Sequence, residues 1–157
     1  MSRFKNIDRV RPSAVKFLKS GHYTDALPGT RDYYEYWDGE KKRCLYGYTV
    51  DSGTPEALSV TGFHYFYLNY CPIDRAIDEI MPDGTTQSRR ERTFPSFYDG
   101  DWEYYHEIEK ARAQDKHMIV LKARRKGYSY KAGSMLARNY FFVRNSKNFV
   151  FAAQKEY

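Results

Sequence analysis

The sequence predicts an α/β protein in which a parallel β-α-β unit follows a β-rich, aromatic segment. Two short apolar runs, His117–Leu121 and Phe149–Ala153, have the length and composition of buried strands. Between them, apolar residues recur at helical spacing and predict a helix with one buried face formed by Ala132, Met135, Leu136, Tyr140 and Val143. Strand, helix and strand at this spacing are typical of a parallel unit.

The composition favours a folded chain with an anionic partner. A length of 157 residues allows one domain with a proper core, and 41% hydrophobic and 18% aromatic residues exclude a disordered chain. The net charge of +6 suits a nucleotide or DNA. Cys44 and Cys71 form no C-x-x-C pair, which fits a reducing cytosol. Met1–Ser20 does not resemble a signal peptide, and no run reaches the about 20 apolar residues of a membrane helix. We therefore expect a soluble intracellular protein.

The first third of the chain shows one helical and one hairpin pattern. Pro12 and Ser13 begin a short helical pattern, which Gly21 closes as a C-cap. Asp38-Gly39 separates two aromatic, alternating segments, Tyr33–Trp37 and Arg43–Val50, and this arrangement predicts a β-hairpin.

The next segments predict further β-structure and then a helix. Val60–Tyr70 is dense in aromatic residues and predicts one or two buried strands. Ile73–Ile80 and Ser88–Phe94 flank a Pro-Asp-Gly-Thr turn and predict a second hairpin, although the apolar residues of the first segment also fit helical spacing. Asp101 is the expected N-cap of a helix through Gln114. We therefore predict a β-rich lead segment, 1–95, and a second domain that begins at 96–157.

The most informative stretch is Met118–Lys131, which predicts a strand, a basic loop and a helix start. A phosphate-binding loop needs this context, because the N–H groups at a helix N-terminus favour an anion. Compared with G-x-x-x-x-G-K-[ST], Gly127 and Ser129 occupy the sixth and eighth places. Lys122 occupies the first-glycine place and Tyr128 the lysine place, so the positive charge has moved to the start of the loop.

This loop has two interpretations, and its charge favours one of them. A basic turn between a buried strand and a helix is the simpler one. However, five cationic residues crowd into ten positions: Lys122, Arg124, Arg125, Lys126 and Lys131. A bound polyphosphate would relieve their mutual repulsion, which favours a phosphate site.

The loop K-A-R-R-K-G-Y-S resembles the deviant Walker A motif of the large terminase subunits of tailed bacteriophages. The resemblance extends to the helix Tyr130–Tyr140, the strand Asn148–Ala153 and the upstream segment Thr61–Ile73, and it spans roughly residues 20–157. It implies the N-terminal part of a P-loop NTPase domain, incomplete here, and an ATPase that binds ATP with Mg²⁺.

The resemblance also implies the catalytic residues. Lys122 would contact the β- and γ-phosphates of ATP. Arg125 would sense the γ-phosphate, where an arginine stabilises transition-state charge. Arg124 is the alternative for that role, and the sequence does not separate the two.

The remaining loop residues would complete the nucleotide site. Gly127 would allow close backbone approach to the phosphates, or serve as a simple turn glycine. Ser129 would offer its hydroxyl to Mg²⁺, or cap the helix. Tyr128 is assigned to the nucleotide pocket, together with Ala123 and Lys126.

Adenine contacts are expected just upstream of the loop, in Pro95–Trp102. Trp102 or Tyr98 would stack on the base, and core packing is the alternative for both. The family often has a glutamine nearby, and this segment has none.

The resemblance implies the partners of a packaging motor. These are double-stranded phage DNA, the small terminase subunit and the portal of the procapsid, with a homo-oligomeric ring in the host cytoplasm and no membrane. The sequence ends shortly after the second predicted strand, before any Walker B strand or nuclease domain. We therefore expect a fragment of a longer protein or a truncated product, inactive as an ATPase alone.

Two other classes remain open. One is another P-loop ATPase, such as a helicase-like motor. The other is a non-enzymatic nucleic-acid-binding module that uses basic and aromatic residues. A second basic run, Ser88–Arg92, is interpreted as a solvated hairpin edge, with a DNA contact as the alternative.

Overall fold

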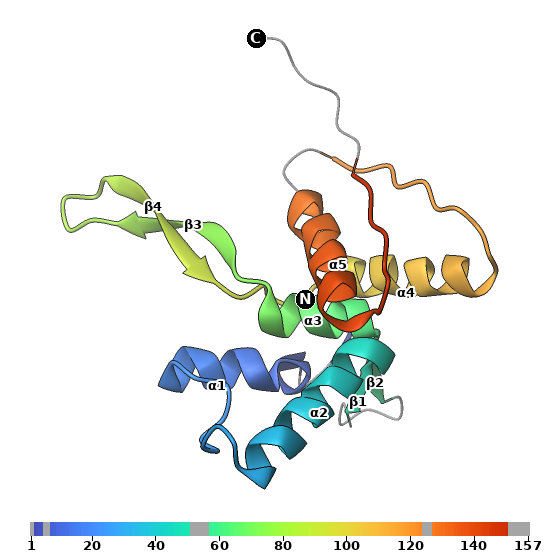
Figure 1. The fold of residues 1–157 in the computed structure, drawn as a ribbon. Coiled ribbons are helices and arrows are strands. Elements are labelled where there is room, and N and C mark those ends of the chain that lie inside the picture. Colours follow the sequence, from blue (N-terminus) through green and yellow to red (C-terminus); the bar gives the residue numbers. More distant parts are fainter. Residues whose placement is uncertain (1, 5–6, 51–56, 124–126, 151–157) are drawn as a thin grey trace.

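A computed structural model describes residues 2–4, 7–50, 57–123 and 127–150. In this part the chain is mixed α/β and mainly helical (Figure 1). The helices are the 3₁₀ turn η1 (Ile7–Val10), α1 (Pro12–Ser20), α2 (Arg31–Tyr46), α3 (Gly62–Tyr70), α4 (Asp99–Ala113) and α5 (Tyr128–Phe142). Two antiparallel pairs form the β-structure: β1 (Tyr48–Val50) with β2 (Leu58–Val60), and β3 (Ile73–Ile80) with β4 (Thr86–Thr93).

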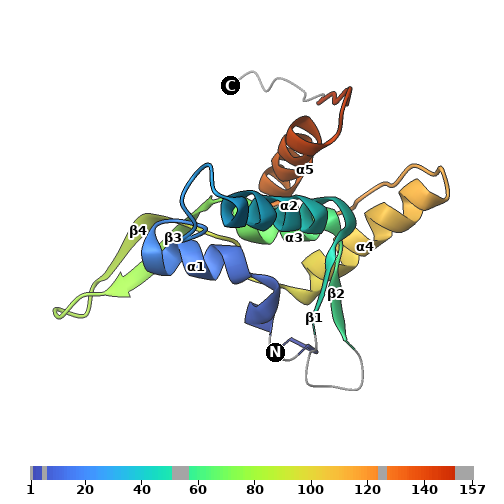
Figure 2. The same ribbon diagram turned by 60° about the horizontal axis from the view of Figure 1, so that its bottom comes forward.

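Helix α3 lies at the centre of the molecule, in contact with α1, α2, α4 and α5 (Figures 1 and 2). Residues 62–69 are all buried, as expected of a helix enclosed on every side. The prediction of strands in Val60–Tyr70 is therefore wrong for all but the β2 residue Val60. A short apolar run does not by itself distinguish a buried strand from a buried helix. Here Thr61 decides locally, because its hydroxyl accepts from the His64 N–H at 3.3 Å and starts the helix.

The start of α3 packs directly on the end of α2. A Cβ atom on Gly62 would lie 2.5 Å from the Cys44 carbonyl oxygen, so only glycine permits this approach. Arg138 of α5 donates from Nε to the Cys44 carbonyl and from Nη2 to the Leu45 carbonyl, each at 2.9 Å. These bonds satisfy carbonyls in the last turn of α2 and place a cation at its negative end.

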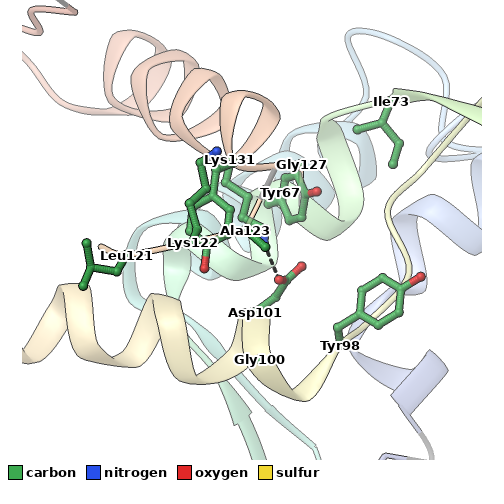
Figure 3. Close-up of a pocket in the computed structure, with 11 residues that line it drawn as sticks. Tyr67, Ile73, Tyr98, Gly100, Asp101, Leu121, Lys122, Ala123, Gly127 and Lys131 are labelled. Atoms are coloured by element: carbon green, nitrogen blue, oxygen red, sulfur yellow. Dashed lines mark hydrogen bonds and ion pairs between the residues drawn. The ribbon is translucent and has the colours of Figure 1, made fainter. Parts of the chain in front are cut away.

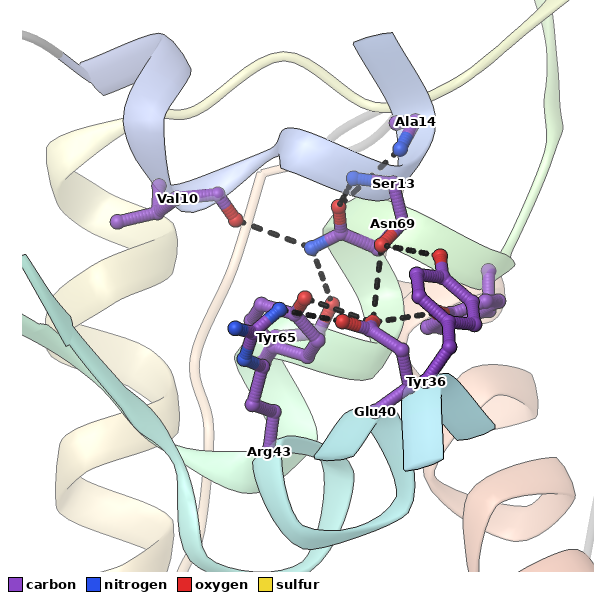
Figure 4. Close-up of polar contacts among 9 residues, drawn as sticks. Val10, Ser13, Ala14, Tyr36, Glu40, Arg43, Tyr65 and Asn69 are labelled. Atoms are coloured by element: carbon purple, nitrogen blue, oxygen red, sulfur yellow. Dashed lines mark hydrogen bonds and ion pairs between the residues drawn. The ribbon is translucent and has the colours of Figure 1, made fainter. Parts of the chain in front are cut away.

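Asn69 of α3 fixes the start of α1. Its Oδ1 accepts from the backbone N–H groups of Ser13 (3.1 Å) and Ala14 (3.2 Å), and its Nδ2 donates to the carbonyls of Val10 and Tyr65 at 3.0 Å (Figure 4). The residue before α1 makes no side-chain cap. A distant side chain thus caps α1, which as predicted begins at the Pro-Ser pair and ends at Gly21.

Glu40 connects α1, α2 and α3 through a buried polar cluster (Figure 4). Its side chain accepts from the hydroxyls of Ser13 at 2.9 Å, Tyr65 at 2.8 Å and Tyr70, and pairs with Arg43. Glu40 is only 2% exposed. Its charge is accommodated in the core because hydroxyls and a guanidinium bind the carboxylate.

The hairpin predicted at Asp38-Gly39 does not form, because both residues lie inside α2. The Thr30 hydroxyl caps that helix by accepting from the Tyr33 N–H at 3.3 Å, and burial of Glu40 and Cys44 against α3 fixes its inner face. Tertiary packing therefore overrides the turn signal. The expectation of a β-rich lead segment over 1–95 is wrong for the described residues, which are largely helical before β3.

The second predicted hairpin is confirmed, and it projects away from the helices (Figures 1 and 2). Its register places Asp74 opposite Arg92 and Arg75 opposite Glu91. Of the β4 arginines, Arg92 therefore faces an acidic residue of β3, and Arg89 forms an ion pair with Glu79 at 3.9 Å. This pairing agrees with a solvated hairpin edge for Ser88–Arg92.

The two helices predicted in the second half are present, but the parallel sheet is not. Helix α4 starts at Asp99 with Tyr98 as its N-cap residue, so Asp101 lies in its first turn. His117–Leu121 forms no strand, nor do residues 149–150, and residues 151–153 lie outside the described part. Ile119 and Leu121 are 90% and 95% exposed, because no described strand lies beside them. Both described sheets are antiparallel, so the parallel β-α-β unit is not formed by these residues.

Candidate phosphate-binding pocket

A cavity of about 660 Å³ lies at the start of α5 (Figure 3). Four parts of the chain enclose it: the end of α3 and the start of β3, the first turn of α4, the extended segment before the basic loop, and the first turn of α5. The lining residues are Tyr67, Ile73, Tyr98, Gly100, Asp101, Leu121, Lys122, Ala123, Gly127, Tyr128 and Lys131.

Gly127 lines this cavity at the start of α5. It precedes α5 with φ of 68°, in the left-handed region that favours glycine, and no side chain caps the helix there. Backbone N–H groups of a first helical turn lack intrahelical partners and carry positive partial charge. The wall of the cavity formed by Gly127 and Tyr128 is therefore suited to an anion.

Two lysines line the same cavity. Lys122 lies at the end of the extended segment, with its Nζ 5.9 Å from the centre of the Tyr128 ring. Lys131, one turn into α5, lies with its Nζ 4.2 Å from that ring and 5.7 Å from the ring of Tyr104. The Tyr128 ring thus lies within cation-π reach of both ammonium groups.

Lys131 forms an ion pair with Asp101 that joins α5 to the first turn of α4 (Figure 3). The two residues are only 4% and 9% exposed. Burial raises the pKa of the Asp101 carboxyl, and the nearby Lys131 ammonium opposes that rise. The cavity wall therefore contains a buried carboxylate as well as two cations.

A second cavity of about 460 Å³ adjoins the first, sharing Lys122, Gly127 and Tyr128. Its other lining residues include Ser129 of α5 and Asp74 of β3. Ser129 is exposed on the first turn of α5, so its hydroxyl is accessible. The structure thus brings five of the predicted site residues together around one helix start: Lys122, Ala123, Gly127, Tyr128 and Ser129.

Four predicted site residues remain, of which only Trp102 lies in the described part of the chain. Arg124, Arg125 and Lys126 lie outside the described residues. Trp102 lines neither cavity: its Nε1–H donates to the Ser59 carbonyl at 2.6 Å, and its ring lies 3.9 Å from that of His106. Its packing in the structure matches the core alternative.

Sequence reasoning misses several residues of the pocket, among them Tyr67, Asp101 and Lys131. The sequence places Tyr67 in a predicted strand and Asp101 at a helix cap, and it gives Lys131 only as one of the loop cations. A signal existed for Lys131, because it lies in the first turn after the motif. Nothing in the sequence pairs it with Asp101, thirty positions earlier.

Within the described ranges, no three His, Cys, Asp or Glu side chains gather as a metal site. His64, buried and stacked between Phe97 and Tyr105, has no hydrogen-bond partner on either ring nitrogen among the described residues. Burial lowers the pKa of His64 to about 3. In the same part of the chain, no helix has the length and apolar character required to cross a membrane.

Comparison with known proteins identifies no relative: no family model, no curated protein and no solved structure matches this chain. A functional proposal therefore rests on the loop sequence and on the geometry of the pocket around it.

Proposed function

We propose that the loop Lys122–Ser129 binds the phosphates of ATP, and that the chain is the N-terminal, P-loop ATPase segment of a large terminase subunit. One observation carries the nucleotide part of this proposal. Four residues of the motif, Lys122, Ala123, Gly127 and Tyr128, line a cavity at the N-terminus of a 15-residue helix. The terminase part rests on the resemblance of the loop and of Thr61–Ile73 to that family.

The pocket suggests how the nucleotide is held. The phosphates lie against the first turn of α5, where Gly127 and Tyr128 present backbone and Lys122 supplies charge. Arg125, or Arg124 in its place, contacts the γ-phosphate by resemblance, and Lys126 completes the loop. Tyr98 is 57% exposed at the opposite wall, formed by the start of α4. We therefore assign base stacking to Tyr98 rather than to Trp102.

The residues present fit a magnesium ion that arrives with ATP. Mg²⁺ prefers hard oxygen ligands, usually one or two from the protein with substrate phosphates and water. The exposed Ser129 hydroxyl, in a cavity that shares Lys122 and Gly127 with the main pocket, provides one such oxygen. The ion would neutralise phosphate charge that Lys122 alone does not.

Family resemblance extends the proposal to the whole motor. The complete protein would use ATP to drive double-stranded DNA into a procapsid, as a ring on the portal, with the small subunit as partner. A separate nuclease domain would cut the DNA. Within this assembly we propose nucleotide binding for the present chain, not turnover.

Titration calorimetry with MgATP tests the proposal on this chain. Lys122→Ala is expected to weaken ATP binding by about tenfold or more, the loss of one charge-assisted phosphate contact. Lys116→Ala is the matched control, because Lys116 is exposed on the same extended segment and lines neither cavity. Equal affinities for the wild type and Lys122→Ala, or no ATP binding by the wild type, would contradict the proposal.

A further inference from the structure

The Asp101–Lys131 pair lies outside the phosphate-binding motif, yet it forms part of the pocket wall. Placing two opposite charges in the interior costs desolvation energy that their attraction offsets only with good geometry. Arg138 holds α5 on the end of α2, and the hydroxyls of Tyr105 and Ser134, 3.4 Å apart, join α4 to α5 at another point. The position of the pair beside the cavity points to a ligand.

Lys131 and Lys122 line the same cavity, and both ammonium groups lie near the Tyr128 ring. Lys131 is one turn from Gly127, whose carbonyl accepts its backbone N–H at 3.2 Å. Its side chain packs over the Tyr128 ring, which begins that turn, at 4.2 Å. The aromatic contact and the Asp101 carboxylate together hold the ammonium at the wall of the cavity.

We propose that Lys131 is a second phosphate-binding cation of the pocket, and that Asp101 is the counter-ion from which a polyphosphate withdraws it. This inference rests on the proposed function, since it adds a contact to the same site. A triphosphate carries several negative charges, whereas the carboxylate carries one. The triphosphate also attracts Lys122. Without a ligand, Asp101 stabilises the Lys131 ammonium. When a ligand binds, the Asp101 carboxylate competes with it for that ammonium.

An Asp101 carboxylate that competes with phosphate predicts different mutational effects from an ion pair that only stabilises the fold. If Asp101 competes with phosphate, removing its charge strengthens ligand binding, while removing the charge of Lys131 weakens it. If the pair only joins α4 to α5, both changes loosen the same contact and alter affinity in the same direction. The signs of the two effects therefore discriminate between the roles.

The test is calorimetric titration of the whole chain with inorganic tripolyphosphate and, separately, with MgATP. Lys131→Gln is expected to weaken tripolyphosphate binding by about tenfold, and Asp101→Asn to strengthen it by about threefold. Lys131→Arg keeps the charge and should retain most of the affinity. Circular dichroism and thermal melting of each variant establish that it is folded.

Two results would overturn the inference. One is wild-type affinity in a folded Lys131→Gln variant, and the other is a loss of affinity in both variants together. Should Lys131→Gln not fold, Asp101→Asn decides alone: tighter binding supports the competition, and unchanged or weaker binding refutes it.

Failure of the inference is distinguishable from failure of the proposed function. Sensitivity to Lys122→Ala without sensitivity to Lys131→Gln leaves the phosphate site in place and removes Lys131 from it. Absence of both ATP and tripolyphosphate binding in the wild type removes the two proposals together.

Discussion

Glu40 and Asp101 are both buried carboxylates paired with a cation, but their surroundings differ. Glu40 accepts from three hydroxyls and Arg43 where α1, α2 and α3 meet. Asp101 pairs with Lys131 in the wall of a cavity of about 660 Å³. The first arrangement joins three helices around a shared acceptor. The second leaves space for a ligand beside the charges, so a similar ion pair serves structure in one place and is proposed to serve binding in the other.

Removal of the Glu40 carboxylate should have the largest effect. Glu40→Ala leaves the Arg43 guanidinium and three hydroxyls without their shared acceptor, which is expected to cost about 4 kcal/mol of unfolding free energy. Urea denaturation measures it, with Glu35→Ala on the exposed face of α2 as the control. A change below about 1 kcal/mol would remove the structural half of the comparison.

The buried His64 should have the next largest effect on the free energy of unfolding, and this effect depends on pH. The pKa of His64 is lowered to about 3 by burial, whereas the unfolded chain takes up a proton near pH 6.5. The unfolded state therefore binds more protons between these values, and stability falls as the pH drops through this window. From pH 7 to pH 4 the loss is about 3 kcal/mol for this group.

His64→Phe isolates that contribution. The replacement retains an aromatic ring between Phe97 and Tyr105 and removes two ring nitrogens that have no described hydrogen-bond partner. We expect the stability advantage of the variant to grow as the pH falls from 7 to 4, measured by urea denaturation at each pH. Parallel stability profiles for the two proteins would show that His64 is not buried as a neutral group.

Alanine substitutions at two helical glycines compare the core with the pocket helix, and their expected effects on stability are smaller. Gly62→Ala places a Cβ atom against the end of α2 and should cost about 2 kcal/mol. Gly133→Ala, inside α5 with nothing within 4 Å of the added carbon, should instead stabilise the protein by about 0.5–1 kcal/mol. Thermal melting distinguishes the two, and a neutral Gly62→Ala would mean that α3 and α2 do not pack as closely as described.

Local signals were sufficient where the structure depends on neighbours in sequence. The β3–β4 hairpin, α1 with its glycine C-cap, and the helices α4 and α5 agree with the patterns of turn residues and apolar spacing. The helix after the basic loop also begins where the motif predicted, directly after Gly127. Turns, caps and amphipathic stripes are properties of a few adjacent residues, so a sequence pattern captures them.

Tertiary structure alone decided the elements whose partners lie far away. Whether Val60–Tyr70 is strand or helix, and whether Asp38-Gly39 turns or continues a helix, depends on the burial of α2 and α3 against each other. The run His117–Leu121 has strand composition, but a strand needs a hydrogen-bonded neighbour, and none lies beside it among the described residues. The pocket was likewise decided in part by contacts between distant residues. The sequence by itself determined the chemistry of the loop. Folding brought Asp101 to Lys131, placed Tyr98 at the cavity and packed Trp102 against the core, because these contacts join segments that are distant in the chain.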